Sequence, residues 1–306
     1  MEKMMLTIFT PTYNRAYILP KLYESLCGQK DNKYKFEWLI IDDASDDNTE
    51  VLVNEWKSTE NDFEIRYFKQ LHGGKHRALN KAFDLAQGEF MFIVDSDDRL
   101  TENAVSLINK WLIDIKEKSE FAGVVGLRIS SDGKVWGGNV NFTEHYVDAT
   151  DFEREKYNLL GDKAEIYRTS ILKRFKFPEI PDEYFVTEDY CWMQIAAAGY
   201  KLRWYNQPIY ICEYLNDGLT NTGANSVIGH KKNYKGYCLY VRKCIELKPF
   251  IQKMAHLREF NKTMKVLKVP FEKRRKDIQM SRICYFQLST FGVLVAYLIR
   301  KVRYRK

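Results

Sequence analysis

The chain has 306 residues, of which 45% are hydrophobic and 29% charged, the balance of a soluble globular protein with one or two domains. This composition excludes a chain that is disordered throughout. The net charge of +7 is concentrated near the C-terminus: residues 264–306 hold 12 Lys and Arg against 2 Asp and Glu, which leaves 36 against 39 for residues 1–263.

Short apolar runs alternate with helical patterns over the first 130 residues, which predicts βαβ units around a mostly parallel sheet flanked by helices. Strands are expected at residues 6–10, 36–42, 64–68, 89–95 and 121–129, and helices at 16–28, 49–58, 75–87 and 102–118.

The pattern is less regular between residues 130 and 217. SDGKVWGGN indicates a hairpin turn, a helix is expected from Thr187 as its N-cap to Gly199, and two strands separated at Pro208 should follow. Beyond residue 226 the pattern is helical.

Polar segments follow the first four predicted strands. TPTYNR comes after the first strand, DDASDD after the second, QLHGGKHR after the third and DSDDR after the fourth. Open sheets of this class bind ligands outside the carboxyl ends of their strands, so these segments are candidates for a binding site.

Asp95, Asp97 and Asp98 lie within four positions after a buried strand, although like charges repel and burial raises their free energy. A solvated turn whose Asp side chains bond their own backbone would explain the pattern. The alternative is a site for Mg²⁺ or Mn²⁺, which prefer oxygen ligands and often share them with substrate phosphates. A diphosphate-bearing substrate would then be the natural partner.

The first two polar segments also have two interpretations each. Asp42 and Asp43 could cap the next helix, or a carboxylate could accept the N–H of a uracil or guanine ring. Tyr13 could stack on a base and Arg15 could bind phosphate, although Pro-Thr-Tyr is also an ordinary loop sequence.

The third segment places two glycines before a helix that carries Lys75 and Arg77. It is either a flexible turn with a solvated basic face, or a backbone that approaches phosphate with a helix N-terminus and cations around it. It matches neither the P-loop nor the GxGxxG pattern.

Glu188 and Asp189 follow Thr187 in the first turn of a predicted helix. The helix dipole favours acidic residues there without any function, and the alternative is a general base that deprotonates a hydroxyl.

Several classes of site are excluded by missing motifs. None of the five histidines belongs to an HExxH motif, and no GxSxG is present, so zinc and serine hydrolases are not expected. The six cysteines form no CxxC pair, which fits a reducing cytosol. The apolar run near the N-terminus is too short for a signal peptide, so export by that route is not expected.

Five segments together resemble, in order, the signatures of the inverting family-2 glycosyltransferases with the GT-A nucleotide-sugar fold. They are FTPTYNR, LIIDDASDDNT, GGKHRALN, FIVDSDDRL and YFVTEDYCW, and they span roughly residues 5–215. The resemblance implies a GT-A (Rossmann-like) α/β domain over residues 1–225, with a nucleotide-binding half to about 130 and an acceptor half from 131, followed by a helical region over 226–306.

The resemblance also implies roles for individual residues. Those expected to bind the nucleotide sugar are Pro11, Tyr13, Arg15, Asp42, Asp43, Lys75, Arg77, Asp95 and Ser96. Asp95 and Asp97 match the DxD pair of the family, with Asp97 as the direct ligand of Mn²⁺ or Mg²⁺ and Asp95 facing the ribose or the metal. Asp189 matches the catalytic base, and Glu188 would assist at the acceptor.

The implied reaction is a single in-line displacement, with inversion, from a UDP-sugar to a hydroxyl of a glycan or lipid-linked oligosaccharide. The processive synthases of the family carry QxxRW, whereas KLRWY has no Gln at that place, so a single addition is expected. Two rivals stay open: a non-catalytic nucleotide-sugar or glycan-binding subunit, and a sugar-phosphate nucleotidyltransferase, whose GxGTRxxP loop is missing from TPTYNR.

An apolar segment over residues 283–299 is followed by the basic sequence RKVRYRK. As a helix it would cover about 25 Å, short of a hydrocarbon core. An interfacial helix is expected, on the cytoplasmic face of the plasma membrane, which would suit bacterial capsule or O-antigen assembly. The alternatives are a helix packed on the domain and a nucleic-acid contact, for which no known module is present.

Overall fold

The computed structural model describes residues 6–30, 35–213 and 226–290. The chain divides into two compact units. The first consists of Met1–Phe177 and Ala198–Leu215, and the second of Pro178–Ala197 and Asn216–Lys306. The domain boundary expected at residue 225 stays a prediction.

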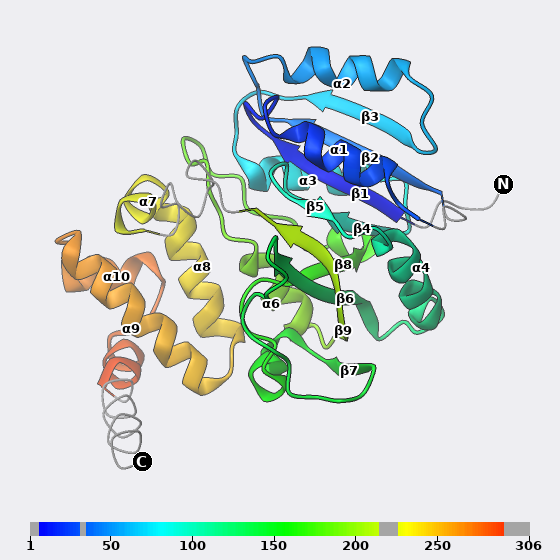
Figure 1. The fold of residues 1–306 in the computed structure, drawn as a ribbon. Helices are drawn as coiled ribbons and strands as arrows, with labels where there is room; N and C mark the ends of the chain where they lie inside the picture. Colours follow the sequence, from blue (N-terminus) through cyan, green and yellow to red (C-terminus); the bar gives the residue numbers. More distant parts are fainter. Residues whose placement is uncertain (1–5, 31–34, 214–225, 291–306) are drawn as a thin grey trace. The chain divides into compact units, whose positions relative to one another are not determined.

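A sheet of nine strands, counted over the described residues, forms the centre of the first unit (Figure 1). The strands are β1 (Leu6–Thr12), β2 (Phe36–Asp42), β3 (Glu64–Lys69), β4 (Phe90–Ile93), β5 (Arg99–Leu100), β6 (Phe121–Ser130), β7 (Tyr146–Ala149), β8 (Ala164–Arg168) and β9 (Lys201–Cys212). Their order is β3-β2-β1-β4-β8-β6-β9-β5, and β7 pairs with β9.

Strands β3, β2, β1 and β4 are parallel, as the βαβ pattern predicts, and their connecting helices pack on the sheet. The helices of this unit are α1 (Leu19–Cys27), α2 (Thr49–Ser58), α3 (Lys75–Leu85), α4 (Ala104–Ile115) and α5 (Thr169–Leu172), with a 3₁₀ helix over Asp151–Tyr157. The predicted strand 36–42 and helix 49–58 have the observed bounds, and the prediction of an α/β sheet flanked by helices is confirmed.

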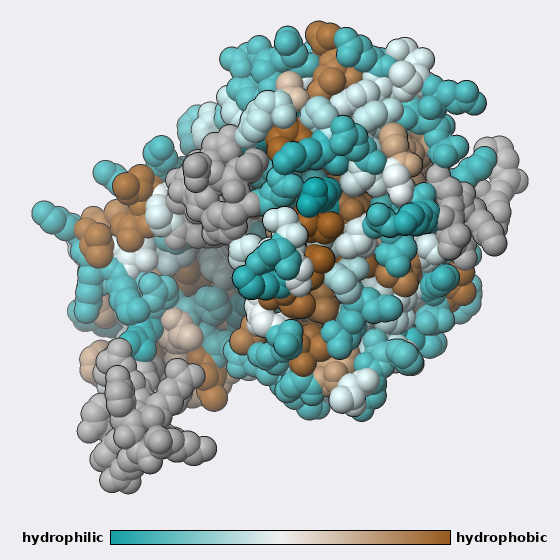
Figure 2. Space-filling view, viewed as in Figure 1, coloured by the Kyte–Doolittle hydropathy of each residue, from teal (hydrophilic) through white to brown (hydrophobic). Residues whose placement is uncertain are grey.

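The helices bury one face each. Leu19, Leu22 and Leu26 of α1 are fully buried against the sheet, whereas Val51 of α2 is 58% exposed. Figure 2 shows mainly hydrophilic residues, with single apolar ones among them, over the outer side of α2 at the top of the view.

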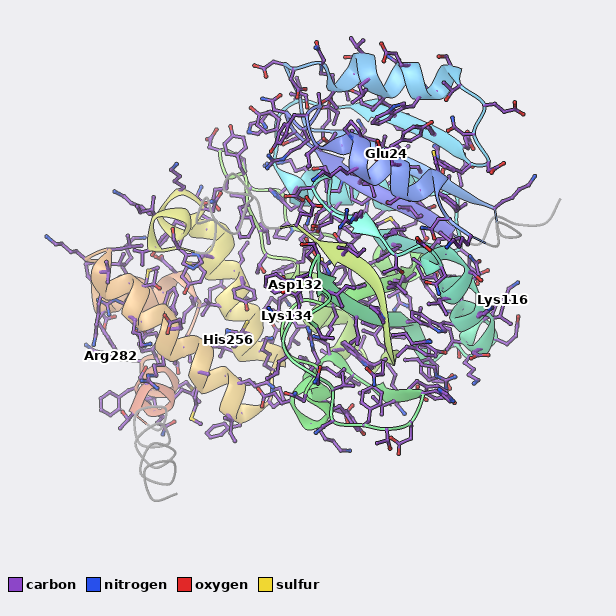
Figure 3. The ribbon with its side chains drawn as sticks, viewed as in Figure 1. Glu24, Lys116, Asp132, Lys134, His256 and Arg282 are labelled. Atoms are coloured by element: carbon purple, nitrogen blue, oxygen red, sulfur yellow. The ribbon has the colours of Figure 1, made fainter. Side chains whose placement is uncertain are left out.

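Two details of the sheet differ from the sequence prediction. Strand β8 lies antiparallel between β4 and β6, so it interrupts the parallel pairing, which resumes between β6 and β9. The segment around Pro208 is one strand and not two, because β9 continues past the proline through register shifts against β6 at Val125 and Leu127. The predicted hairpin turn is present, with Asp132 and Lys134 forming an exposed ion pair of 2.6 Å (Figure 3).

The second unit is helical over its described residues. It contains α6 (Asp189–Ala197), α7 (Val227–Lys232), α8 (Tyr234–Leu247), α9 (Phe250–Val266) and α10 (Phe271–Asp277). Its core joins α8 to α9 and to the segment after α10 through Tyr237, Val241, Leu257, Phe260, Ile278 and Tyr285.

The C-terminal apolar segment expected over residues 283–299 lies mostly outside the described residues. In the part of the chain that the structure describes, no helix has both the length and the apolar character needed to cross a membrane.

Candidate functional site

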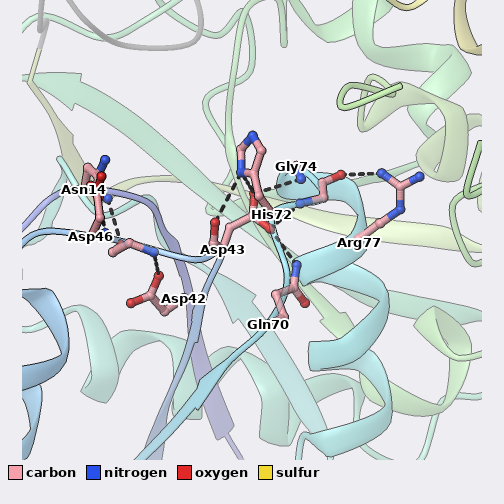
Figure 4. A network of polar contacts seen from close by, with 10 residues as sticks. Asn14, Asp42, Asp43, Asp46, Gln70, His72, Gly74 and Arg77 are labelled. Atoms are coloured by element: carbon pink, nitrogen blue, oxygen red, sulfur yellow. Dashed lines mark hydrogen bonds and ion pairs between the residues drawn. The ribbon is translucent and has the colours of Figure 1, made fainter. Parts of the chain in front are cut away.

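The loops after β1 and β2 are bonded to each other at one edge of the sheet (Figure 4). The parallel strands are in register, with Thr12 beside Asp42. Beyond them Asn14 N donates to Ser45 Oγ at 2.8 Å, and Asn14 Oδ1 accepts from Asp46 N at 2.9 Å. Asn14 has a positive φ of 53°, which asparagine tolerates better than most residues.

Asp42 is the last residue of β2, at the carboxyl end of the parallel strands. Its side chain is fully buried, Oδ1 accepts from Ser45 N at 2.7 Å, and Oδ2 accepts from Tyr67 Oη at 2.5 Å. Burial and the charge of Asp42 hold the pKa of Tyr67 well above its ordinary value, so the phenol remains a donor. Asp42 therefore fixes the loop after β2.

Asp43 holds the loop that leads into α3. Its carboxylate accepts from the backbone N–H groups of Gly73 and Gly74, both at 2.8 Å, and from Gln70 Nε2 at 2.8 Å. His72 Nδ1 lies 3.0 Å from the same carboxylate, as Figure 4 shows. Gly74 has φ 88°, a conformation that a side chain would strain.

Tyr13 and Arg15 lie on the loop after β1. The ring of Tyr13, which is 47% exposed, lies 4.7 Å from the ring of His72. Arg15 Nη1 donates to Tyr17 Oη at 2.8 Å. A half-exposed aromatic ring can stack on a base and an Arg can bind phosphate, and this loop carries both.

The basic residues at the start of α3 point in two directions. Lys75 Nζ lies 2.5 Å from Asp95 Oδ1, on the loop after β4, while Arg77 Nη1 donates to Gly73 O at 2.5 Å. The polar segments after β3 and β4 are thus joined by an ion pair.

The carboxylates of DSDD have different surroundings. Burial opposes ionisation of Asp95, but the charges of Lys75 and Arg128 lower its pKa. Burial and the neighbouring charge of Asp95 raise the pKa of Asp97, with a partial offset from Arg15. Asp95 therefore has its counter-ions within the protein. The ionised form of Asp97 is destabilised by the charge of Asp95, and an added cation would stabilise it.

Asp98 anchors the same loop to β9. Its carboxylate accepts from Tyr210 Oη at 2.7 Å and from Glu213 N at 2.9 Å. The Tyr210 hydroxyl also accepts from Asp95 N at 3.0 Å. Burial, followed by the charge of Asp95, raises the pKa of Asp98 to about 7.

Arg128 and Tyr210 are two residues of this site that the sequence does not reveal. The Arg128 guanidinium lies 4.2 Å from the centre of the Tyr210 ring and 4.0 Å from Asp95. Their positions on β6 and β9 are opposite one another in the sheet register. Only the pairing of two strands far apart in the chain brings them to the loop.

Glu188 and Asp189 belong to the second unit. Asp189 is the first residue of α6, and its Oδ2 accepts from Tyr240 Oη at 2.8 Å and lies 2.9 Å from Lys248 Nζ. Glu188 O accepts from Cys191 N at 2.9 Å. Within the described residues, Asp189, Cys244 and His256 form a group of potential metal ligands whose atoms lie within 4.8 Å of one another, and Asp95 and Asp97 are not part of such a group.

Comparison with known proteins identifies the family. Residues 7–184 match the model of "Glycosyl transferase family 2", which is more than half of the chain. The chain belongs to glycosyltransferase family 2. The match covers the polar segments after β1, β2, β3 and β4 and ends before Asp189.

Curated relatives of this family-2 chain are glycosyltransferases of bacteria. An uncharacterized glycosyltransferase of Mycoplasma genitalium is 32% identical over 35% of the chain and 37% of its own length. The GalNAc(5)-diNAcBac-PP-undecaprenol beta-1,3-glucosyltransferase of Campylobacter jejuni is 26% identical over 62% of the chain, which spans 59% of that relative. The abequosyltransferase of Salmonella typhimurium is 25% identical over 72% of the chain and 70% of its own length.

Solved structures share the GT-A fold. Residues 1–349 of Staphylococcus aureus TarS in complex with UDP-GlcNAc match with a TM-score of 0.62 at 20% identity, over 90% of this chain and 79% of that one. A mannosyltransferase of Pyrobaculum calidifontis in complex with GDP-Man and Mn²⁺ matches with a TM-score of 0.52 at 17% identity, over 95% and 80%. The fold of the family-2 chain is therefore that of the GT-A glycosyltransferases.

Proposed function

We propose that this family-2 glycosyltransferase is metal-dependent and inverting, and that it transfers one sugar from a UDP-sugar to a hydroxyl of a glycan or lipid-linked acceptor. Membership of the family supports glycosyl transfer. The observation that carries the finer proposal is the charge arrangement after β4, where Asp97 lies beside an Asp95 that Lys75 and Arg128 already compensate.

The donor set after β4 fits a divalent cation. Asp97 would be the direct ligand, because burial and Asp95 disfavour its negative charge without a counter-ion. Asp95 would face the ribose or the metal. A bound Mn²⁺ or Mg²⁺ would supply a positive charge for the departing nucleoside diphosphate.

Of the other residues expected at the nucleotide-sugar pocket, some would contact the nucleotide sugar and others would hold the pocket in shape. Tyr13 would stack on the base, and Arg15, Lys75 and Arg77 would lie near the ribose and diphosphate. The buried contacts of Asp42 and Asp43 support a role in shaping the pocket. Pro11, at the end of β1, and Ser96, which is 7% exposed, would complete its wall.

Asp189 would remove the proton of the acceptor hydroxyl during attack, with Glu188 at the acceptor. An attack by the acceptor itself on the anomeric carbon, without a covalent enzyme intermediate, inverts the configuration of that carbon. A carboxylate placed as a base contributes about 10²- to 10⁴-fold to the rate.

A panel of UDP-sugars with Mn²⁺ and an acceptor glycan tests the proposal through released UDP and labelled product. We expect Asp97→Asn to lose metal-dependent protection of the protein by the donor against heat, and Asp189→Asn to keep that protection while transfer falls at least 100-fold. Donor binding without UDP release by the unchanged protein would instead indicate the non-catalytic binding subunit. Transfer that survives in Asp97→Asn with chelator present would contradict the metal site.

The biological setting that we propose is the assembly of bacterial cell-surface polysaccharide on the cytoplasmic face of the membrane. The name of the Campylobacter relative includes an undecaprenol-linked acceptor, and that of the Salmonella relative an abequosyl transfer. The excess of basic residues near the C-terminus supports a peripheral contact with anionic lipid.

A further inference from the structure

Asp189 is held by a second helix of its own unit. Tyr240 lies on α8, and Lys248 directly follows that helix. Their hydroxyl and ammonium groups contact the same oxygen of Asp189, Oδ2, at 2.8 and 2.9 Å. These contacts join the first residue of α6 to a helix that begins 45 residues later in the chain, beyond the region that the family model matches.

The two oxygens of Asp189 are not equivalent. Oδ2 has the two short contacts, whereas Oδ1 has a longer one, 3.3 Å, to Lys248 Nζ. Burial, followed by the charge of Asp189, holds the pKa of Tyr240 well above its ordinary value, so its phenol donates throughout the range of an enzyme assay. Oδ2 is thus anchored, and Oδ1 is the oxygen better placed to take a proton.

The loop before Asp189 is anchored to the N-terminus of the same helix. Glu183 accepts from the backbone N–H groups of Lys235 and Gly236, both at 2.7 Å. Asn233 Oδ1 accepts from Tyr184 N at 2.8 Å and from Phe185 N at 3.0 Å. One helix therefore fixes both the approach to Asp189 and the orientation of its carboxylate.

The ammonium group of Lys248 already lies beside the group formed by Asp189, Cys244 and His256. Lys248 Nζ occupies the surroundings of Asp189 Oδ2 at 2.9 Å, and an ammonium there repels a metal ion. His256, labelled in Figure 3, has its pKa lowered by burial and by Lys248. These surroundings favour an oriented carboxylate over a second metal site.

We propose that Tyr240 and Lys248 are positioning residues for Asp189, whose carboxylate they orient so that Oδ1 meets the acceptor hydroxyl. The inference rests on the proposed role of Asp189 as the base. It assigns a part in the reaction to the helical region after residue 226, which the family's sequence signatures do not cover.

The test compares kcat and donor KM for transfer in Tyr240→Phe, Lys248→Met and Lys248→Arg. We expect the first two to lower kcat by about 10- to 100-fold, because a misplaced catalytic group loses rate of that order, while donor KM changes less than twofold. Lys248→Arg keeps a cation, so its fall in log kcat should be at most half of the fall caused by Lys248→Met.

Matched controls exist in the same unit. Asp277 of α10 accepts from Tyr234 of α8 and lies 2.8 Å from Lys273 Nζ, so it reproduces the Tyr-Asp-Lys arrangement away from the proposed base. Tyr234→Phe and Lys273→Met should leave kcat within twofold. If they lower kcat as much as Tyr240→Phe and Lys248→Met do, the effect is structural and the inference is wrong.

Failure of the inference can be told from failure of the proposed function. If Asp189→Asn transfers at the rate of the unchanged protein, Asp189 is not the base and the proposed function needs another. If Asp189→Asn is inactive but Tyr240→Phe and Lys248→Met keep full kcat, only the inference is overturned. If the proposed function and the inference are both correct, adding Lys248→Met to Asp189→Asn should not lower kcat further, since the two side chains act as one unit.

Discussion

At the scale of single residues, a partly buried group of charges on β6, β8 and the 3₁₀ helix bears on stability. Glu165 of β8 lies near Arg154 and Arg128, and burial raises its pKa to about 7 against the opposing charges of both arginines. Lys163, two residues earlier, is fully buried and donates to Trp136 O at 2.8 Å. Burial and Arg154 lower the pKa of this lysine to about 8.

Replacing Glu165 with Gln should reduce the pH dependence of stability. Because the folded-state pKa of Glu165 lies above its unfolded value of about 4.3, the unfolded chain loses the proton first, and the free energy of unfolding falls as pH rises from about 4 to about 7. The fall due to this one group is on the order of 3 kcal/mol, and Glu165→Gln removes it.

Urea unfolding between pH 4.5 and 7.5 measures this difference. Asp98, whose pKa burial also raises to about 7, leaves a residual slope in the variant. Glu155→Gln, an exposed change on the 3₁₀ helix, serves as the control and should keep the full slope. Equal slopes in Glu165→Gln and the unchanged protein would contradict the expected titration.

At the scale of elements, the turn between β3 and α3 depends on one carboxylate. Asp43, directly after β2, accepts from two consecutive backbone N–H groups directly before α3 and from Gln70. Without it, Gly73 N and Gly74 N lose their partner, and Lys75 is no longer fixed opposite Asp95.

We expect Asp43→Ala to lower the free energy of unfolding by about 2–4 kcal/mol, since hydrogen bonds to a charged group contribute about 1.5–3 kcal/mol each and part is regained by solvation. Protection of the protein by a UDP-sugar against heat should also fall. Asp43→Asn keeps an acceptor oxygen and should lose less. Asp46→Ala, an exposed change in the same loop, is the control, and a loss as large as that of Asp43→Ala would show that the loop is sensitive to any substitution there.

Local sequence patterns predicted the positions of individual helices and strands well. The order and pairing of the strands could not be predicted in the same way, because they depend on contacts between distant segments. The alternation of apolar residues is enough to place 36–42 in a strand and 49–58 in a helix, because each period depends on neighbouring residues only. The insertion of β8 beside β4 depends on hydrogen bonds between segments about 75 residues apart, which no local period encodes. Pro208 was expected to end a strand, yet sheet pairing outweighed its missing N–H.

The candidate site shows the same division. Asp95 and Asp97 stand out in the sequence because carboxylates at a strand end are unusual, and the structure places Lys75 against Asp95. Arg128 and Tyr210 are ordinary strand residues until β6 pairs with β9. The contacts of Asp189 with α8 likewise depend on the tertiary packing of the second unit.

At the scale of the whole molecule, charge is distributed unevenly along the chain. Residues 264–306 hold 12 basic and 2 acidic residues, whereas the preceding 263 residues are slightly acidic. Part of the basic segment has a structural role, because Arg274 Nε donates to Val269 O and Ile278 and Tyr285 are buried in the core of the second unit. A membrane role therefore has to be tested with residues beyond that core.

Removal of residues 291–306 should weaken binding to vesicles of anionic lipid at least tenfold while the melting temperature stays within about 2 °C, because Ile278 and Tyr285 keep their packing. Each basic residue near an anionic surface contributes about 1 kcal/mol, and the deleted segment carries five. Co-sedimentation with anionic and with neutral vesicles, at low and high salt, measures the effect.

A second variant separates charge from apolar contact in this tail. It keeps the apolar segment and replaces only the terminal cations with Gln, at Arg300, Lys301, Arg303, Arg305 and Lys306. If the interfacial helix binds through both features, this variant should retain salt-independent binding that the deletion loses, since burial of apolar side chains is not screened by salt. Unchanged sedimentation of both variants with anionic vesicles would show that the tail is not the membrane contact.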